Sequence, residues 1–139
     1  MGIAIKQNTD GSAGLQGAGL GEGEFCLVDM QWFPTAVSGP SLVTSRDYVL
    51  KSIVAAVEVA GTDAGAVTGI VYMAPSGTAL AAGTALHTGT INLKGTAATN
   101  QVLAALAGTR IPAGYRVGIV FTGVLTAAVG CVTAGLCPA

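Results

Sequence analysis

The side chains that could carry chemistry are few and widely spaced in this sequence. His87 is the only histidine, and no Gly-x-Ser-x-Gly motif supplies a serine for it to activate. Glu58 stands alone in an apolar run, and Asp63 lies in a Gly-rich turn, where aspartate commonly bonds the local backbone. No two carboxylates have a recognisable general acid and base arrangement. We therefore predict that the protein is not an enzyme and that His87 is an ordinary strand or loop residue.

Metal and cofactor motifs are also absent from the sequence. Cys26, Cys131 and Cys137 form no Cys-x-x-Cys pair, and their odd number is typical of reduced thiols in a protein made in the cytoplasm. The Gly-rich stretch 17–23 has neither the Gly-x-Gly-x-x-Gly spacing nor the Gly-Lys-Ser/Thr ending of a phosphate-binding loop. We expect no metal and no cofactor.

Charge is scarce in this chain of 139 residues. Charged residues make up 9% of it, against about 25% in an average soluble domain, and the mean hydropathy is +0.65. The length suffices for one domain that buries a core without disulfides. A surface so poor in charge is expected to be covered by a membrane, by other copies or by a partner. The basic residues are scattered, which argues against nucleic-acid binding; they are Lys6, Arg46, Lys51, Lys94, Arg110 and Arg116.

Residues 1–24 have the composition of a flexible arm. They include seven glycines, and Leu15 and Leu20 are among their few large apolar side chains. Because glycine loses the most backbone entropy on ordering, we expect this arm to become ordered only against a neighbouring surface. It contains no apolar run of signal-peptide length, so we expect no export signal. Residues 25–139 then form the single folded domain.

The first strand is expected within residues 25–37, which hold Phe25, Trp32 and Phe33. Two roles are open for these aromatic side chains. They either enter the core or anchor the protein on a neighbouring subunit, where tryptophan is enriched. Residues 39–41, Gly-Pro-Ser, are predicted to be a loop.

Residues 48–60 fit both a helix and a strand. We prefer a strand because valine and isoleucine dominate it. Its shared face would comprise Val49, Ile53, Val57 and Val59. Residues 67–74 form the next predicted strand, in which the odd-numbered side chains lie on one face.

The dipeptide Gly-Thr then recurs at 77, 83, 89 and 95. A six-residue period can indicate a β-helix, but too few repeats are present to stack. We prefer two short strands within residues 84–94, followed by a strand at 102–106. The inward side chains of the first region are predicted to be Ala85, Gly89, Ile91 and Leu93.

The last part of the chain reads as a closing hairpin over 110–136. Pro112 suits the second position of a tight turn and Gly114 the fourth. The inward side chains are predicted to be Val117, Ile119 and Phe121, and then Val132, Ala134 and Leu136. An alternative is a membrane-spanning helix, because residues 117–139 carry no charge; the glycines and β-branched residues in that stretch oppose it.

Seven or eight short strands separated by Gly, Pro and Thr turns predict an all-β antiparallel sandwich. A jelly roll is the variant that we expect, with the final hairpin supplying one strand to each sheet or two to one sheet.

Three stretches together resemble small structural proteins from the head modules of tailed bacteriophages: APSGTAL at 74–80, LHTGTINLKGTA at 86–97 and IPAGYRVGIVFTGVLTAAVG at 111–130. Such proteins coat or cement the capsid. The resemblance covers about residues 45–139. It implies a β-sandwich that forms a dimer or trimer and binds the major capsid protein on the outside of the virion, after synthesis in the host cytoplasm.

We therefore expect a capsid decoration protein whose partners are the major capsid protein and itself, with no nucleic acid and no membrane. The alternatives are a phage tail or fibre adhesion module and a small membrane protein. The side chains that we select as interface candidates are Leu15, Leu20, Phe25, Trp32, Phe33, Tyr115 and Arg116.

Overall fold

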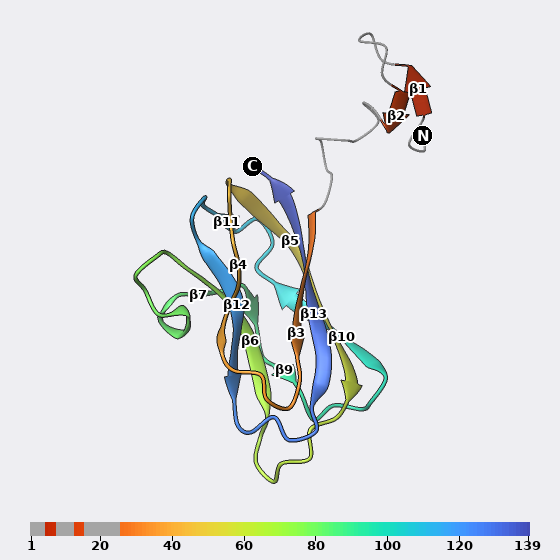
Figure 1. Ribbon diagram of the computed structural model, residues 1–139, viewed down its shortest axis with the longest axis vertical. Coiled ribbons are helices and arrows are strands. Elements are labelled where there is room, and N and C mark those ends of the chain that lie inside the picture. Colours follow the sequence, from red (N-terminus) through yellow and green to blue (C-terminus); the bar gives the residue numbers. More distant parts are fainter. Residues whose placement is uncertain (1–4, 8–12, 16–25) are drawn as a thin grey trace.

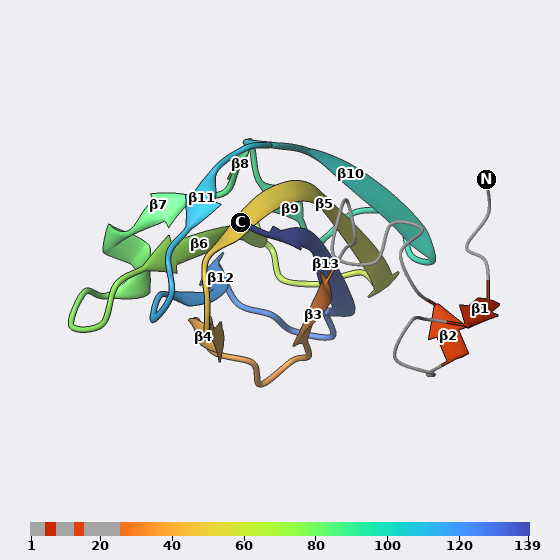
Figure 2. The ribbon, with the colours of Figure 1, turned by 90° about the horizontal axis from the view of Figure 1, so that it is seen from above.

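The computed structural model describes residues 5–7, 13–15 and 26–139. From Cys26 onward the chain forms two antiparallel sheets that face each other, which confirms the predicted β-sandwich (Figures 1 and 2). The only helical element in the described residues is the 3₁₀ turn η1 (Leu80–Ala82). The strands are β3 (Cys26–Trp32), β4 (Gly39–Val43), β5 (Tyr48–Val59), β6 (Thr68–Ala74), β7 (Thr84–Ala85), β8 (His87–Thr88), β9 (Ile91–Asn92), β10 (Thr99–Ala105), β11 (Arg110–Ile111), β12 (Arg116–Thr122) and β13 (Val129–Pro138).

Most strands that follow each other in the sequence belong to different sheets. The larger sheet runs β3-β13-β5-β10-β8, with β11 also paired to β5, and the smaller runs β4-β12-β6-β7, with β9 also paired to β6. The chain therefore crosses from one sheet to the other between β3 and β4, β4 and β5, and β5 and β6. It crosses again between β12 and β13, so these strands are not a hairpin, and each sheet receives one of them.

The core lies between the two sheets, which Figure 2 shows from above. Alternation along β12 and β13 buries five of the six side chains that the sequence predicted there, and Phe121 is half-buried against the same cluster. The largest fully buried side chains are Trp32, Met30, Leu50, Ile53, Leu86, Ile91, Leu93, Ile111 and Leu136.

β5 is a strand, as predicted, but its buried face changes phase part-way along. β13 skips a residue of β5: Gly135 is paired with Ser52, and Leu136 with Leu50, so Lys51 is the extra residue of a β-bulge. The inward side chains are therefore Leu50 before the bulge and Ile53, Ala55 and Val57 after it. The prediction was wrong for Val49, which is half-buried, and for Val59, which is 43% exposed.

The predicted loop at 39–41 is instead part of β4. Pro40 is accommodated because β4 is the edge of the smaller sheet, where a missing N–H is tolerated. The pairing of β4 with β12 shifts register between Val117 and Gly118, opposite Leu42 and Pro40.

The turn before β12 is present, but it spans residues 112–115, one residue later than predicted. The Tyr115 N–H donates to the Pro112 carbonyl at 3.3 Å, so Pro112 is the first residue of the turn and Gly114 the third, with φ +81°. Buried Thr44 holds it: its hydroxyl donates to the Pro112 carbonyl at 2.7 Å and accepts from the Tyr115 N–H at 3.1 Å.

The Gly-Thr repeat forms neither a β-helix nor two regular strands. β7 pairs with β6, β8 pairs with β10, and β9 pairs with β6, so the chain changes sheets twice within nine residues. Ile91 and Leu93 are buried as predicted. Leu86 and His87 are also buried, whereas Gly89 is exposed, because each change of sheet resets the alternation.

Within the predicted arm, the structure describes only β1 (Ile5–Gln7) and β2 (Ala13–Leu15), which pair antiparallel. The rest of the predicted arm, with Leu20 and the Gly-rich stretch 17–23, lies outside the described residues, and so does Phe25.

Candidate interaction surface

The side of the larger sheet that faces away from the core is broad and nearly uncharged; we call it the outer face. Strand register arranges its side chains in rows across β3, β13, β5 and β10. Leu27 is 71% exposed and Val102 is 82% exposed. The rows are Gln31, Cys131, Ala56 and Asn100; then Asp29, Thr133, Val54 and Val102; then Leu27, Gly135 and Ser52.

Asp29 is the only charged side chain in these rows. Its carboxylate accepts a hydrogen bond of 2.7 Å from the hydroxyl of Thr133, the residue opposite it on β13. Lys51 and Glu58, which are exposed on β5, lie outside these rows. Covering the rows therefore removes little charge from water, which keeps the desolvation penalty of binding low.

β3 is the outermost strand of the larger sheet on one side. It has seven residues and no proline, whereas the edge strand β4 contains Pro40, and β7 and β8 are two residues long. No strand of the described residues pairs with the far side of β3. A long, unprotected edge of this kind is a template for an added strand.

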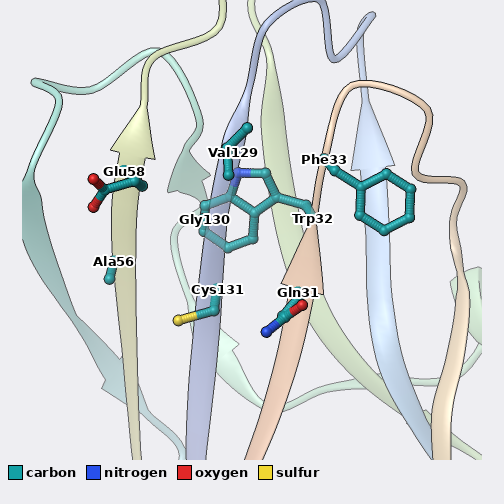
Figure 3. A pocket seen from close by; sticks show the side chains of 8 residues that line it. All are labelled: Gln31, Trp32, Phe33, Ala56, Glu58, Val129, Gly130 and Cys131. Atoms are coloured by element: carbon teal, nitrogen blue, oxygen red, sulfur yellow. The ribbon is translucent and has the colours of Figure 1, made fainter.

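A shallow cavity of about 310 Å³ lies at the Trp32 end of this edge (Figure 3). Its lining residues come from the ends of β3, β5 and β13 and are Gln31, Trp32, Phe33, Ala56, Glu58, Val129, Gly130 and Cys131. Trp32 lies against Gly130, where a Cβ atom would come within 2.4 Å of the indole. The glycine thus makes room for the ring.

The two aromatic candidates of β3 have different positions. Trp32 is 1% exposed and belongs to the core, as the first of the two sequence interpretations held. Phe33, the next residue, is 50% exposed. Only Phe33 therefore offers its ring to a partner.

Arg116 begins β12 of the smaller sheet and Tyr115 ends the turn before it, so both are away from the outer face. Tyr115 is half-buried against the core, and the Arg116 guanidinium donates to the Thr78 carbonyl. Leu15 is in β2, and Leu20 and Phe25 are outside the described residues. The seven candidates therefore form no single surface within the described part of the chain.

The sequence interpretation missed the residues that do gather here, among them Leu27, Gln31, Glu58, Val102 and Cys131. A signal was available for three of them: strict alternation starting from buried Met30 and Trp32 places Leu27 and Gln31 outward, and alternation along 99–105 exposes Val102.

His87 has a structural role. Its Nε2 accepts a hydrogen bond of 3.0 Å from the Val71 N–H, and its Nδ1 lies 3.2 Å from the Thr88 carbonyl. The neutral tautomer with the proton on Nδ1 satisfies both contacts. Because β8 belongs to the larger sheet and β6 to the smaller, this ring joins the two sheets. Burial lowers the pKa of His87 below its ordinary value of 6.5, although the Thr88 carbonyl opposes the shift.

The lowered pKa predicts that acid destabilises the protein. The unfolded chain binds a proton at His87 more readily than the folded chain does, so stability is full above pH 6.5 and falls as the pH drops through the folded pKa. We expect the urea midpoint to fall between pH 7 and pH 5. A His87→Gln variant should have a flatter profile over that range, and an equally steep one would contradict this account.

The described residues contain no group of three or more His, Cys, Asp or Glu side chains that could hold a metal ion. Residues 117–139 contain most of β12 and all of β13 and no helix, so the alternative of a spanning helix there is wrong. None of the helices in the described residues has the length and apolar character needed to cross a bilayer.

No family model, curated protein or solved structure matches the chain.

Proposed function

We propose that the protein is a virion structural protein that decorates the outside of a tailed-phage capsid and stabilises the head. The observation that carries the proposal is the outer face, which spans four strands and whose rows hold Asp29 as their one charged residue. Leu27 and Val102 project from it into solvent. Such a face is suited to packing against other subunits.

Decoration needs many weak contacts rather than one strong site. A small oligomer that binds several coat subunits converts each later contact into an intramolecular one, so that the total affinity exceeds that of any single contact. An N-terminal arm that becomes ordered on a neighbour adds a further contact. The partners in this proposal are the major capsid protein and further copies of this chain.

We also propose that the sandwich is a jelly roll. Its support is the strand order: eight of the eleven strands divide into β3-β13-β5-β10 and β4-β12-β6-β7, the two-residue strands β8, β9 and β11 add to these sheets, and the chain crosses between the sheets repeatedly. A jelly roll consists of eight strands in two sheets.

Mixing the purified protein with heads assembled without it tests the function. The protein should co-sediment with the heads and raise the temperature at which they break open. A Val102→Glu variant places a charge on the outer face and should weaken binding, while Val37→Glu, at an equally exposed residue before β4, should not. Failure to associate, or an unchanged disruption temperature, would refute the proposal.

Deleting residues 1–24 tests the arm in the same assay. We expect an unchanged circular dichroism spectrum and weaker binding to the heads. Binding equal to that of the full chain would remove the role given to the arm.

A further inference from the structure

We infer that the cavity at the Trp32 end of β3 is a binding site for a lysine or arginine side chain of a partner protein. This deepens the proposed function, because a coat subunit that presents such a side chain would be held here. Two features meet in the cavity: an unpaired carboxylate, and an apolar lining next to a buried donor.

Glu58 supplies the negative charge. It is exposed, it is the only charged residue that lines the cavity, and it makes no hydrogen bond or ion pair with any described residue. Asp29 lies on the same outer face, one row from Gln31 and Cys131. No basic residue belongs to the cavity lining or to these rows. The field at this corner therefore favours a cation.

The rest of the lining suits the aliphatic stem of such a side chain. Ala56 and Val129 are apolar, and the nearly buried Trp32 is also among the lining residues (Figure 3). Lysine and arginine commonly pack their methylene groups on apolar surface while the charged end remains near water. With Glu58 at the rim, the cavity offers both environments.

Trp32 adds a donor that lacks a partner. The indole N–H is buried and has no hydrogen-bond acceptor in the described residues, and Figure 3 shows the indole nitrogen on the side of the ring toward Val129. A buried donor without an acceptor costs about 1–3 kcal/mol. Because Val129 is on β13, this nitrogen faces away from the free edge of β3 and reports on what occupies the cavity.

Trp32 is the only tryptophan, so its indole N–H gives a single resonance in a ¹⁵N-labelled sample. The probe is the peptide acetyl-Thr-Val-Lys-Val-Thr-amide, compared with the same peptide carrying norleucine in place of lysine. In the full-length protein we expect the lysine peptide to shift the Trp32 resonance saturably. The norleucine peptide should bind about three- to fivefold more weakly, which is the range of one partly exposed ion pair.

Glu58→Gln should remove this preference for lysine, whereas Asp63→Asn, which changes the charge equally in the turn between β5 and β6, should keep it. Unshifted amide spectra away from the cavity would show that both variants are folded. No saturable shift, equal binding of both peptides, or a lysine preference that survives in Glu58→Gln would overturn the inference.

The two proposals fail separately in these assays. Lysine-peptide binding without any association with heads leaves the site intact and refutes the decoration function. Association with heads without peptide binding refutes the binding site and leaves the decoration function intact.

Discussion

Replacing Trp32 by alanine is expected to lower the free energy of unfolding by about 3–5 kcal/mol, the range measured for large aromatic residues removed from protein cores. The side chain is 1% exposed and lies across Gly130, whose missing Cβ leaves the space that the indole fills. Neighbouring backbone cannot close that space easily, because β3, β13 and β5 are hydrogen-bonded side by side there. Urea unfolding followed by circular dichroism measures the effect without tryptophan fluorescence.

Phe33→Ala is the matched control. The two aromatic residues are adjacent in sequence, but half of Phe33 is in solvent. Its removal should change stability by about 0.5 kcal/mol or less. Similar losses in both variants would show that Trp32 does not hold the core in the way its burial indicates.

Gly118→Ala is expected to destabilise the protein by about 1–3 kcal/mol, as overpacked substitutions generally do. A Cβ atom at Gly118 would lie 2.1 Å from the Gly39 carbonyl oxygen and 2.7 Å from the Pro40 Cα. Both obstacles are backbone atoms of β4, which cannot rotate away as a side chain can. The edge strand must therefore move off β12, with loss of pairing on that side of the smaller sheet.

Gly39→Ala provides the comparison from the opposite strand. A Cβ atom there has no other atom within 4 Å, so the substitution should be close to neutral. The same unfolding experiment compares the pair. Equal stabilities for the two variants would mean that β4 can move away from Gly118 without loss of stability. That result would contradict the close approach of β4 to Gly118.

Local sequence pattern sufficed for the all-β class and for most of the buried side chains in β6, β12 and β13. It gave the strand at 48–60 for a sound reason, since β-branched residues dominate it. Alternation failed at Val49 because the bulge at Lys51 is a property of two paired strands, and only the partner β13 reveals it. It failed at Gly89, which was predicted inward and is exposed, because the chain changes sheets on both sides of β8.

The interaction surface was harder to predict than the fold. Large aromatic residues are favoured at interfaces, and for this reason Trp32 was selected as a candidate. The absence of a Cβ atom at Gly130 leaves space for the Trp32 ring, which is therefore buried. The outer face consists of ordinary residues such as Ala56, Cys131 and Val102. They become a surface only when distant strands are placed in register, and that information is absent from any one segment.

The central position of β13 has a consequence for synthesis on the ribosome. β3 and β5 emerge from the exit tunnel long before β13, the strand that lies between them in the larger sheet. Until β13 has emerged, the backbone N–H and C=O groups of β3 and β5 that pair with it have no partner strand. Nascent chains on one polysome are thus exposed to cross-pairing for most of translation, and slowing elongation near residue 129 should increase the insoluble fraction.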